Sequence, residues 1–274
     1  MRSKLLPLIL FLCSTAAFAG DWTAIVPGLD YQEFVEGNID VHVARVDLSN
    51  DDLMVISTRE SDKGTKVSDY AKRNNALVAI NGDYFDDKFN PIGLTIGPCG
   101  QWPNTKDTSR EGVVAIGTHR ADVRTQSEVM NPPEEWIETA LSGWPLLIRN
   151  CTPLSTSLPG SAAFTRSPHP RTAAGVSKDR KTLYLVVADG RRANVPGMTL
   201  AELAMFMSER LDACWAINLD GGGSSAMWLG DHIVNRPSDG VERKVADHLA
   251  VVLKSDYVGC DATSPMISTS TSQR

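Results

Sequence analysis

A strand of interior type runs directly into an acid, three glycines and two serines, and this segment is the part of the chain best suited to chemistry. Residues 216–219 are apolar enough for a buried strand, and Asp220 follows them. Consecutive glycines let a ligand approach the backbone closely, and their amide N–H groups can form a concave anion site. An ordinary tight turn is the competing interpretation, because glycine runs are common in loops. The expected donors beside Asp220 are the amides of Gly221, Gly222 and Gly223 and the hydroxyls of Ser224 and Ser225.

Three further polar clusters lie where other strands should end. Asn81 opens the segment 81–86, which also fits a plain hairpin turn. Arg171, in the segment 169–172, enters a predicted strand and is able to hold an oxyanion through two N–H groups. Asp189 begins the third cluster. A last group of polar residues near the C-terminal end completes the candidate site with Asn235, Ser238, Asp239 and Arg243, followed by Asp247 and His248.

The elements that must position these residues are mostly short strands. Apolar periodicity predicts helices at only two places, and each leads into a strand that precedes a polar cluster. One helix covers residues 67–75. The other begins at Thr199, which forms a capping box with Glu202. The predicted strands cover residues 41–48, 53–58, 77–81, 93–97, 113–117, 173–177, 182–188 and 248–254, with 173–177 paired to 182–188.

Neither a repeat nor an obvious linker divides the chain. We therefore expect a single α+β domain over residues 20–262, with a mixed, largely antiparallel β-sheet and a few helices. Residues 263–274 are rich in Ser and Thr and predict a flexible tail.

The first 19 residues have the pattern of a secretory signal peptide. Arg2 and Lys4 precede a short apolar run, and Ala17 to Ala19 offers the small residues of a cleavage site. The mature protein is therefore expected to be secreted or periplasmic, without stable insertion in a membrane. This leader holds two of the 27 basic residues and none of the 33 acidic ones, so the mature net charge is −8. Such a charge disfavours a nucleic-acid partner.

Four cysteines remain after export, an even number that suits disulfide bonds in an oxidising compartment. Three pairings are possible, and the sequence leaves them open. No C-x-x-C spacing or other ligand pattern indicates a metal, so no cofactor is expected. The four residues are Cys99, Cys151, Cys214 and Cys260.

Together the polar clusters resemble those of the phosphodiester glycosidases related to the mannose 6-phosphate uncovering enzyme. The resemblance runs from about residue 78 to residue 252, and its most specific part is Ile217-Asn-Leu-Asp-Gly-Gly-Gly-Ser-Ser225. The segment before Tyr84, the residues Pro170 to Thr172, and the segment 235–243 match in order and spacing. Asp83 departs from the usual glycine, and Trp144 stands in a stretch that is usually richer in glycine.

This resemblance implies hydrolysis between a sugar anomeric carbon and a phosphodiester, with release of the sugar and a phosphate monoester. The substrate would then be a sugar phosphate or a phosphorylated glycan. Asp220 is the first choice for the carboxylate that stabilises the oxocarbenium-like sugar or activates water, and Asp189 is the second. Arg171 and the amides from Gly221 to Ser224 would stabilise the phosphate. Asn81, Asn235, Ser238, Asp239 and Arg243 are expected to bind the substrate.

Two other functions compete with this interpretation. The segment from Gly222 to Ala226 nearly fits a nucleophile elbow, and Asp239 and His248 follow it in the chain order of a serine hydrolase. The expected hairpin after Ala226 argues against that enzyme, because an elbow leads into a helix. A protein that holds phosphorylated glycans without cleaving them would use the same anion site.

Overall fold

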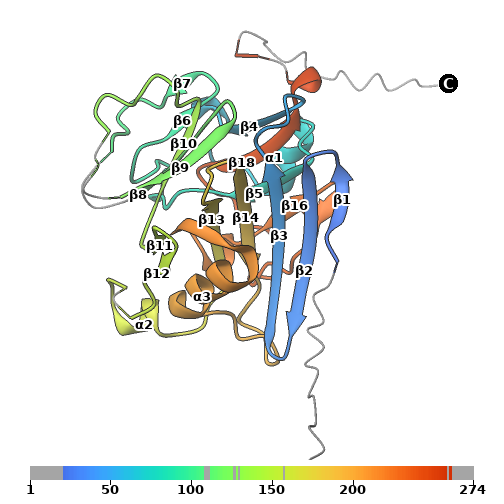
Figure 1. The fold of residues 1–274 in the computed structure, drawn as a ribbon, viewed down its shortest axis with the longest axis vertical. Coiled ribbons are helices and arrows are strands. Elements are labelled where there is room, and N and C mark those ends of the chain that lie inside the picture. Colours follow the sequence, from blue (N-terminus) through green and yellow to red (C-terminus); the bar gives the residue numbers. More distant parts are fainter. Residues whose placement is uncertain are drawn as a thin grey trace, which may run out of the picture.

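The computed structural model describes residues 21–107, 112–125, 128, 130–156, 158–257 and 259–260, and its chain is built from three antiparallel sheets and a few helices (Figure 1). The predicted α+β class with a largely antiparallel sheet is confirmed, and every strand pairing in the described part is antiparallel. The predicted leader 1–19 and the tail 263–274 lie outside the described residues.

The large sheet has eight strands and carries three of the polar clusters at its strand ends. The predicted pairing of strands 173–177 and 182–188 is confirmed, since Ala173 lies opposite Val186. In spatial order its strands are β1 (Thr23–Val26), β2 (Leu29–Glu36), β3 (Ile39–Asp47), β14 (Thr182–Ala188), β13 (Arg171–Ser177), β15 (Ala213–Asn218), β11 (Leu146–Arg149) and β12 (Thr152–Pro153).

Two five-stranded sheets complete the β-structure. The β5 sheet carries Asn81 at the end of its central strand, and the β8 sheet lies beside it. The β5 sheet has the order β17 (His232–Ile233), β16 (Met227–Leu229), β5 (Val78–Asn81), β18 (His248–Leu253) and β4 (Leu53–Ser57). The β8 sheet has the order β7 (Gly100–Gln101), β6 (Ile96–Gly97), β10 (Thr139–Gly143), β8 (Gly112–Gly117) and β9 (Arg120–Arg124).

Apolar side chains from all three sheets form one core between them, with Leu29, Ile80, Leu141 and Ile217 among its fully buried members. The burial of these apolar side chains is the main contribution to the stability of such a domain. Because strands of all three sheets contribute, the ends of β5, β13 and β15 are held close together at one edge of the core.

Helices cover the outer faces of two sheets. In Figure 1, α3 (Leu200–Leu211) lies across the large sheet, and its side chains share a cluster with Ala173 and Val186. The predicted capping box is confirmed, because Thr199 Oγ1 accepts from the Glu202 N–H while Glu202 accepts from the Thr199 N–H. The shorter helices are α1 (Val67–Arg73), which packs on the β5 sheet, and α2 (Ala162–Thr165), with 3₁₀ turns at Glu60–Asp62, Gly222–Ser224 and Lys254–Asp256.

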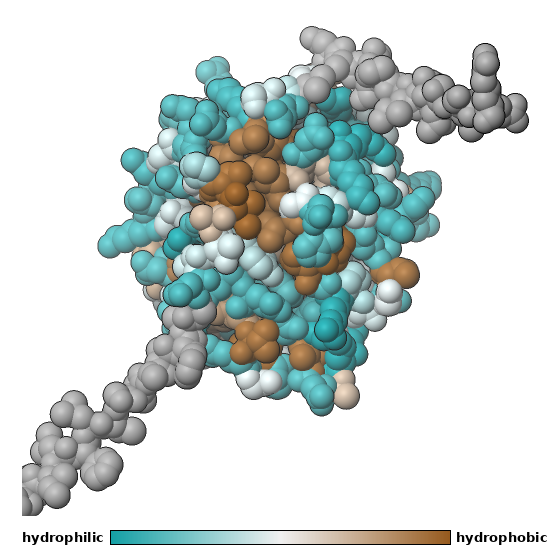
Figure 2. Space-filling view, turned by 90° about the vertical axis from the view of Figure 1, so that its right-hand side faces the viewer, coloured by the Kyte–Doolittle hydropathy of each residue, from teal (hydrophilic) through white to brown (hydrophobic). Residues whose placement is uncertain are grey.

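Two disulfides select one of the three possible pairings of the four cysteines, Cys99 with Cys260 and Cys151 with Cys214. They fit a protein that folds in an oxidising compartment. Figure 2 shows one face of the molecule, which is polar over most of its area and has an apolar area near its centre. Within the described residues, no helix is long and apolar enough to cross a membrane.

Candidate active site

The glycine turn begins where β15 ends, and the neighbouring strands hold it in place. Asp220 donates its N–H to the carbonyl of Gly82 at 3.0 Å, and Gly222 donates to Pro170 at 2.9 Å. A Cβ atom on Gly221 would come 2.9 Å from the Pro170 carbonyl oxygen, so the turn packs tightly against that segment. The carboxylate of Asp220 is therefore fixed beside the ends of β5 and β13.

The amides of this turn are mostly engaged by the protein itself. Gly221 donates to Asp220 Oδ1 at 2.9 Å, and Ser224 donates to the Gly221 carbonyl at 3.2 Å. Of the amides from Gly221 to Ser224, only that of Gly223 makes no hydrogen bond to a described residue. The turn therefore offers a ligand fewer free amides than the sequence predicted. The positive charge near Asp220 comes from arginine side chains.

Burial raises the pKa of Asp220 to about 6. The Ser224 hydroxyl, the Gly221 N–H and the charge of Arg243 oppose that shift to a smaller extent. The group is consequently ionised at neutral pH and becomes protonated just below it. Such a poised carboxyl beside a pocket is typical of a functional site.

A pocket of about 200 Å³ opens beside Asp220. Tyr84, Phe164, Arg171 and Arg191 line it together with Asp220. The pocket therefore places two cations, two aromatic rings and one carboxylate around a single small volume. Its remaining lining residues are His169, Pro170, Gly221 and Gly222.

Arg171 is the first residue of β13, in agreement with its predicted place at a strand, and it is only 3% exposed. Its Nε donates to the Met198 carbonyl at 2.9 Å, and its Nη2 donates to the carbonyls of Phe164 and Ser167 at 2.7 and 3.2 Å. Burial lowers the pKa of Arg171 to about 10, which leaves it charged at neutral pH. Nη1 makes no hydrogen bond to a described residue and remains available for an anion.

Two further arginines lie directly on the glycine turn. A Cβ atom on Gly222 would come 2.8 Å from Arg191 Nη2, and one on Gly223 would come 2.2 Å from Arg243 Nη2. Arg243 also forms an ion pair with Asp239 at 2.6 Å. The glycines are needed because these guanidinium groups occupy the space that side chains would take. Arg191 was not among the predicted site residues, since its neighbours in sequence do not reveal that it folds back over the turn.

Aromatic side chains also line the pocket, and the Phe164 ring lies 5.3 Å from the Arg171 guanidinium. The Tyr84 hydroxyl accepts from Asn218 Nδ2 at 2.6 Å and donates to the Trp144 carbonyl at 3.2 Å. Trp144 stacks on Phe164 with ring centroids 5.2 Å apart. Burial raises the pKa of Tyr84, so its hydroxyl stays protonated. The unusual Trp144 therefore supports one wall of the pocket through Phe164.

Asn81 joins three elements behind the glycine turn. Its Nδ2 donates to the Asp220 carbonyl at 2.7 Å, and its Oδ1 accepts from the Thr172 hydroxyl at 2.8 Å and from the Ala226 N–H at 3.3 Å. Asn81 is completely buried. Its polar atoms are thus directed at protein groups that hold Asp220 in place.

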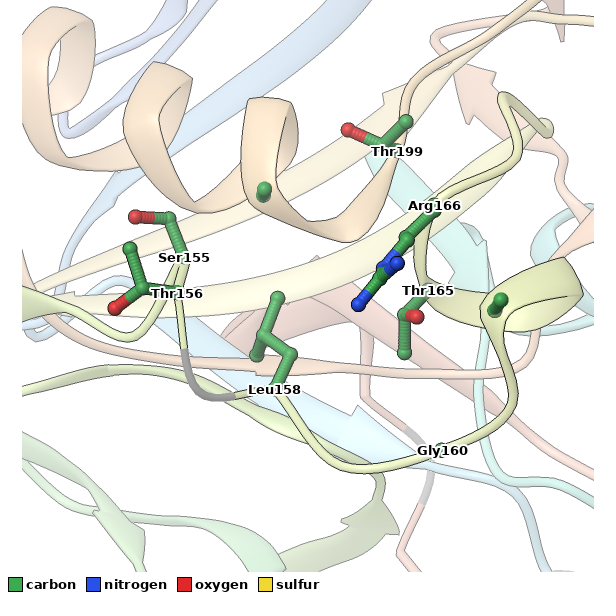
Figure 3. Close-up of a pocket in the computed structure, with 9 residues that line it drawn as sticks. Ser155, Thr156, Leu158, Gly160, Thr165, Arg166 and Thr199 are labelled. Atoms are coloured by element: carbon green, nitrogen blue, oxygen red, sulfur yellow. The ribbon is translucent and has the colours of Figure 1, made fainter.

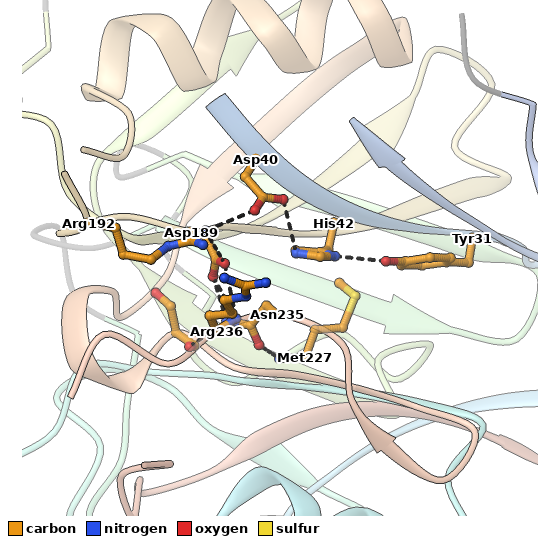
Figure 4. A network of polar contacts seen from close by, with 9 residues as sticks. Tyr31, Asp40, His42, Asp189, Arg192, Met227, Asn235 and Arg236 are labelled. Carbon is orange, nitrogen blue, oxygen red and sulfur yellow. Dashed lines mark hydrogen bonds and ion pairs between the residues drawn. The ribbon is translucent and has the colours of Figure 1, made fainter. Parts of the chain in front are cut away.

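Asp189 and Asn235 form a second buried connection, drawn in Figure 4. Asp189 is 2% exposed and accepts from Arg192 Nη2 at 2.7 Å, from Asn235 Nδ2 at 3.0 Å and from the Arg236 N–H at 3.0 Å. Asn235 also donates to the Ser225 carbonyl at 3.1 Å. This network ties the segment after β17 to the end of the glycine turn. Ser238 lies further along that segment, half-buried, and its hydroxyl makes no hydrogen bond to a described residue.

The residues of a serine hydrolase triad are engaged elsewhere. His248 stacks on Tyr70 at 4.4 Å, and its Nδ1 lies 2.8 Å from the Thr58 hydroxyl. Asp239 is paired with Arg243. After Ser224 the chain enters β16 instead of a helix, so the predicted hairpin is confirmed and the elbow geometry is missing. The serine hydrolase interpretation is therefore wrong.

Another pocket, of about 320 Å³, lies between α2 and the start of α3 (Figure 3). Its lining includes Ser155, Thr165, Arg166 and Thr199, and none of the predicted site residues contributes to it. It contains no carboxylate among its lining residues, so we assign the site to the smaller pocket beside Asp220.

The site combines two arginine side chains with a carboxylate of raised pKa in one pocket. The chain belongs to the phosphodiester glycosidase family, whose model matches residues 74–252. This range contains Asp220, the glycine turn and all three arginines around it. The predicted family is thus confirmed.

Solved structures share the fold at low sequence identity. The catalytic domain of zebrafish N-acetylglucosamine-1-phosphodiester alpha-N-acetylglucosaminidase, auto-inhibited by its pro-peptide, is 22% identical and has a TM-score of 0.68 over 82% of this chain and 84% of that one. A hypothetical protein from Synechocystis is 16% identical, with a TM-score of 0.61 over 83% of this chain and 62% of its own. A putative exported protein from Burkholderia pseudomallei is 18% identical, with a TM-score of 0.58 over 79% and 74%.

A curated relative matches a shorter segment. The SPbeta prophage-derived uncharacterized protein YomE of Bacillus subtilis is 38% identical over 89 residues, which is 32% of this chain and 13% of that protein. The match thus spans a small part of YomE.

Proposed function

We propose that this chain is an exported glycosidase that hydrolyses the bond between a sugar anomeric carbon and a phosphodiester. The observation that carries the proposal is the position of Asp220 in the wall of a pocket that it shares with Arg171 and Arg191. The two disulfides support export, because such bonds persist in oxidising compartments.

The phosphate side of the substrate would lie against the arginines. A phosphate monoester is a good leaving group, since its second pKa is about 6, and it needs less protonation than a sugar alcohol. It does need cations that stabilise the charge it gains as the bond breaks. Arg171 Nη1 and the guanidinium groups of Arg191 and Arg243 supply that charge in this proposal.

The sugar side would face Asp220 and the aromatic wall. The anomeric carbon gains positive charge in an oxocarbenium-like transition state, which an ionised carboxylate stabilises directly or through an activated water. Asp220 is the best candidate because it is ionised at neutral pH and lines the pocket. Tyr84 and Phe164 offer an apolar surface for the ring and one hydroxyl.

Asp189 remains the second acid in this proposal, with a positioning role. Its oxygens already accept hydrogen bonds from Arg192, Asn235 and Arg236. A carboxylate so engaged holds the segment of Ser238, Asp239 and Arg243 against the glycine turn. Asn81 acts in the same way on Asp220.

The substrate class follows from the pocket and from the relatives. The zebrafish relative is named for a sugar linked through a 1-phosphodiester. A pocket lined by cations, aromatic rings and one carboxylate suits the same linkage, so we propose sugar-1-phosphodiesters, including phosphorylated glycans, as substrates.

The test is hydrolysis of a panel of sugar-1-phosphate methyl and phenyl diesters by the purified protein. We expect sugar release that falls by about 10²-fold or more in Asp220→Asn. Asp231→Asn, a change at an exposed acid in the β16–β17 turn, should leave the rate unchanged. Binding of the diesters without sugar release would establish a non-catalytic glycan-binding protein instead, and equal rates in the Asp220 variant and the native protein would remove Asp220 from the mechanism.

A further inference from the structure

We propose that Glu33, Asp40 and His42 form a binding site for a divalent transition cation, with Zn²⁺ as the best fit. The three residues lie on β2 and β3, outside the segment that the family model matches. The site is independent of the proposed glycosidase activity.

The β ladder brings the three side chains to one place. Glu33 and His42 are direct partners across the antiparallel pair of β2 and β3. Asp40 precedes His42 by two residues, so both side chains point to the same face of the sheet. The ligating atoms of all three residues lie within 4.8 Å of one another.

His42 provides the observation that points to an ion. The residue is only 2% exposed, and its Nε2 makes no hydrogen bond in the described part of the structure. This atom is aimed at Asp40 Oδ1, which is also buried without a hydrogen bond (Figure 4). Buried polar atoms are rarely left without a partner. One cation between them would satisfy both.

The separation of these atoms suits metal coordination better than a hydrogen bond. Nε2 and Oδ1 lie 3.4 Å apart. An N–H···O hydrogen bond is usually about 2.9 Å long. Two ligands of a tetrahedral zinc ion, each about 2.1 Å from the metal, are separated by about 3.4 Å.

Neighbouring groups orient the side chains of His42 and Asp40. The Tyr31 hydroxyl lies 2.7 Å from His42 Nδ1, and a hydrogen bond from Nδ1–H to that oxygen leaves Nε2 with its lone pair free. Arg192 donates to Asp40 Oδ2 at 2.9 Å, which fixes the carboxylate while Oδ1 stays free.

The local charge also favours a cation. Glu33, Asp40 and Asp189 are acidic, and Arg192 is the basic residue that faces His42 with them. A divalent ion would neutralise the remaining two negative charges. One imidazole and two carboxylates suit Zn²⁺ with a water in the fourth position, whereas Mg²⁺ prefers oxygen ligands alone.

The test uses the full chain, freed of metal with a chelator and titrated with ZnCl₂ in a calorimeter, and with CoCl₂ while the visible absorption is recorded. We expect one equivalent to bind and the cobalt form to absorb as a low-symmetry four-coordinate site. Glu33→Gln should weaken binding tenfold or more. Because Glu33 is exposed, this variant should keep its fold, and its melting temperature without metal should match that of the native chain.

Asp231→Asn is the matched control, since Asp231 and His232 form an exposed pair that could hold ions weakly. Binding that survives Glu33→Gln and Asp40→Asn but falls in Asp231→Asn would assign the metal to that surface pair and overturn the proposal. Absence of stoichiometric binding to the native chain would overturn it as well. Binding that depends on Glu33 and Asp40, and not on Asp231, would support it.

Discussion

The backbone N–H of Asp83 donates to Asp247 Oδ1 at 2.7 Å, and both residues are buried behind the strand end that holds Asp220. The Thr95 hydroxyl donates to Asp83 Oδ2 at 2.6 Å. Burial and the neighbouring carboxyl raise the pKa of Asp83 well above its usual range, and burial raises that of Asp247. Folding therefore favours the protonated form of both acids. The Gly82 N–H donates to the Asp247 carbonyl, which connects the pair to the backbone of Asp220.

The first prediction concerns Asp83→Asn. A carboxyl whose pKa is raised by folding holds its proton more tightly in the folded state, so stability declines as pH rises from about 4 through the raised pKa. The amide of asparagine imitates the protonated acid and cannot ionise. Urea denaturation at pH 5 and pH 8 should therefore show a smaller loss of stability for the variant than for the native protein.

Asp87→Asn, at an exposed position of the same loop, should keep the native pH dependence. An unchanged pH dependence in Asp83→Asn would show that folding does not raise the pKa of Asp83.

The second prediction concerns the pH dependence of Asp220. Its pKa of about 6 means that the ionised form that the proposed mechanism requires is lost as pH falls through 6. The rate of diester hydrolysis should therefore decline below about pH 6 and level off above pH 7. A rate that rises as pH falls through 6 would instead make Asp220 a general acid.

The ionised carboxylate of Asp220 should also lower the free energy of unfolding at neutral pH. Its pKa is raised by about two units from 3.8, and each unit corresponds to about 1.4 kcal/mol. Asp220→Asn should thus be more stable than the native chain at pH 7.5 by up to about 3 kcal/mol, with little difference at pH 4. Denaturation at the two pH values measures this difference, and equal stability at pH 7.5 would contradict it.

The sequence predicted most of the local elements because their signals are local. The capping box at Thr199, the hairpin after Ala226 and the acid at the end of the strand before Gly221 all depend on residues close in sequence. The contacts that give the site its charge depend on register and on distant segments. Arg191 covers Gly222 only because its segment folds back over the turn, which no sequence spacing reveals.

Sequence spacing likewise does not reveal the contact between the buried acids or the proposed cation site. Asp83 and Asp247 are 164 residues apart in the chain, and their contact requires β5 and β18 to pair with Asn81 opposite His248. Glu33 and His42 show no familiar ligand spacing, because their proximity arises across a β ladder. Metal spacing rules describe ligands on one helix or loop, and they do not detect such pairs.

The third prediction separates two arginines of the pocket. Arg171→Met removes the donors to the carbonyls of Met198, Phe164 and Ser167, and should destabilise the fold by about 2–4 kcal/mol. Arg191→Met changes an exposed side chain, and should alter stability by less than about 0.5 kcal/mol.

The two variants should therefore differ in kinetics and in melting temperature. Arg191→Met should raise KM for the diester about tenfold, because a charge-assisted contact to the phosphate is lost. Native kinetics in a folded Arg191→Met protein would exclude that residue from phosphate binding.

The last prediction concerns Gly223. A methyl group at this position would come 2.2 Å from both Arg243 Nη2 and Asp239 Oδ2. These side chains are partly exposed and can move, so Gly223→Ala should fold with a modest loss of stability of about 1 kcal/mol. The displaced guanidinium should lower kcat/KM for the diester about tenfold or more, since catalysis is sensitive to small shifts of charged groups. Gly259→Ala, where no atom of a described residue lies within 4 Å of the added methyl, should have native activity. Because both changes add the same methyl group, a native kcat/KM in Gly223→Ala would show that the Arg243–Asp239 pair does not contribute to the transition state.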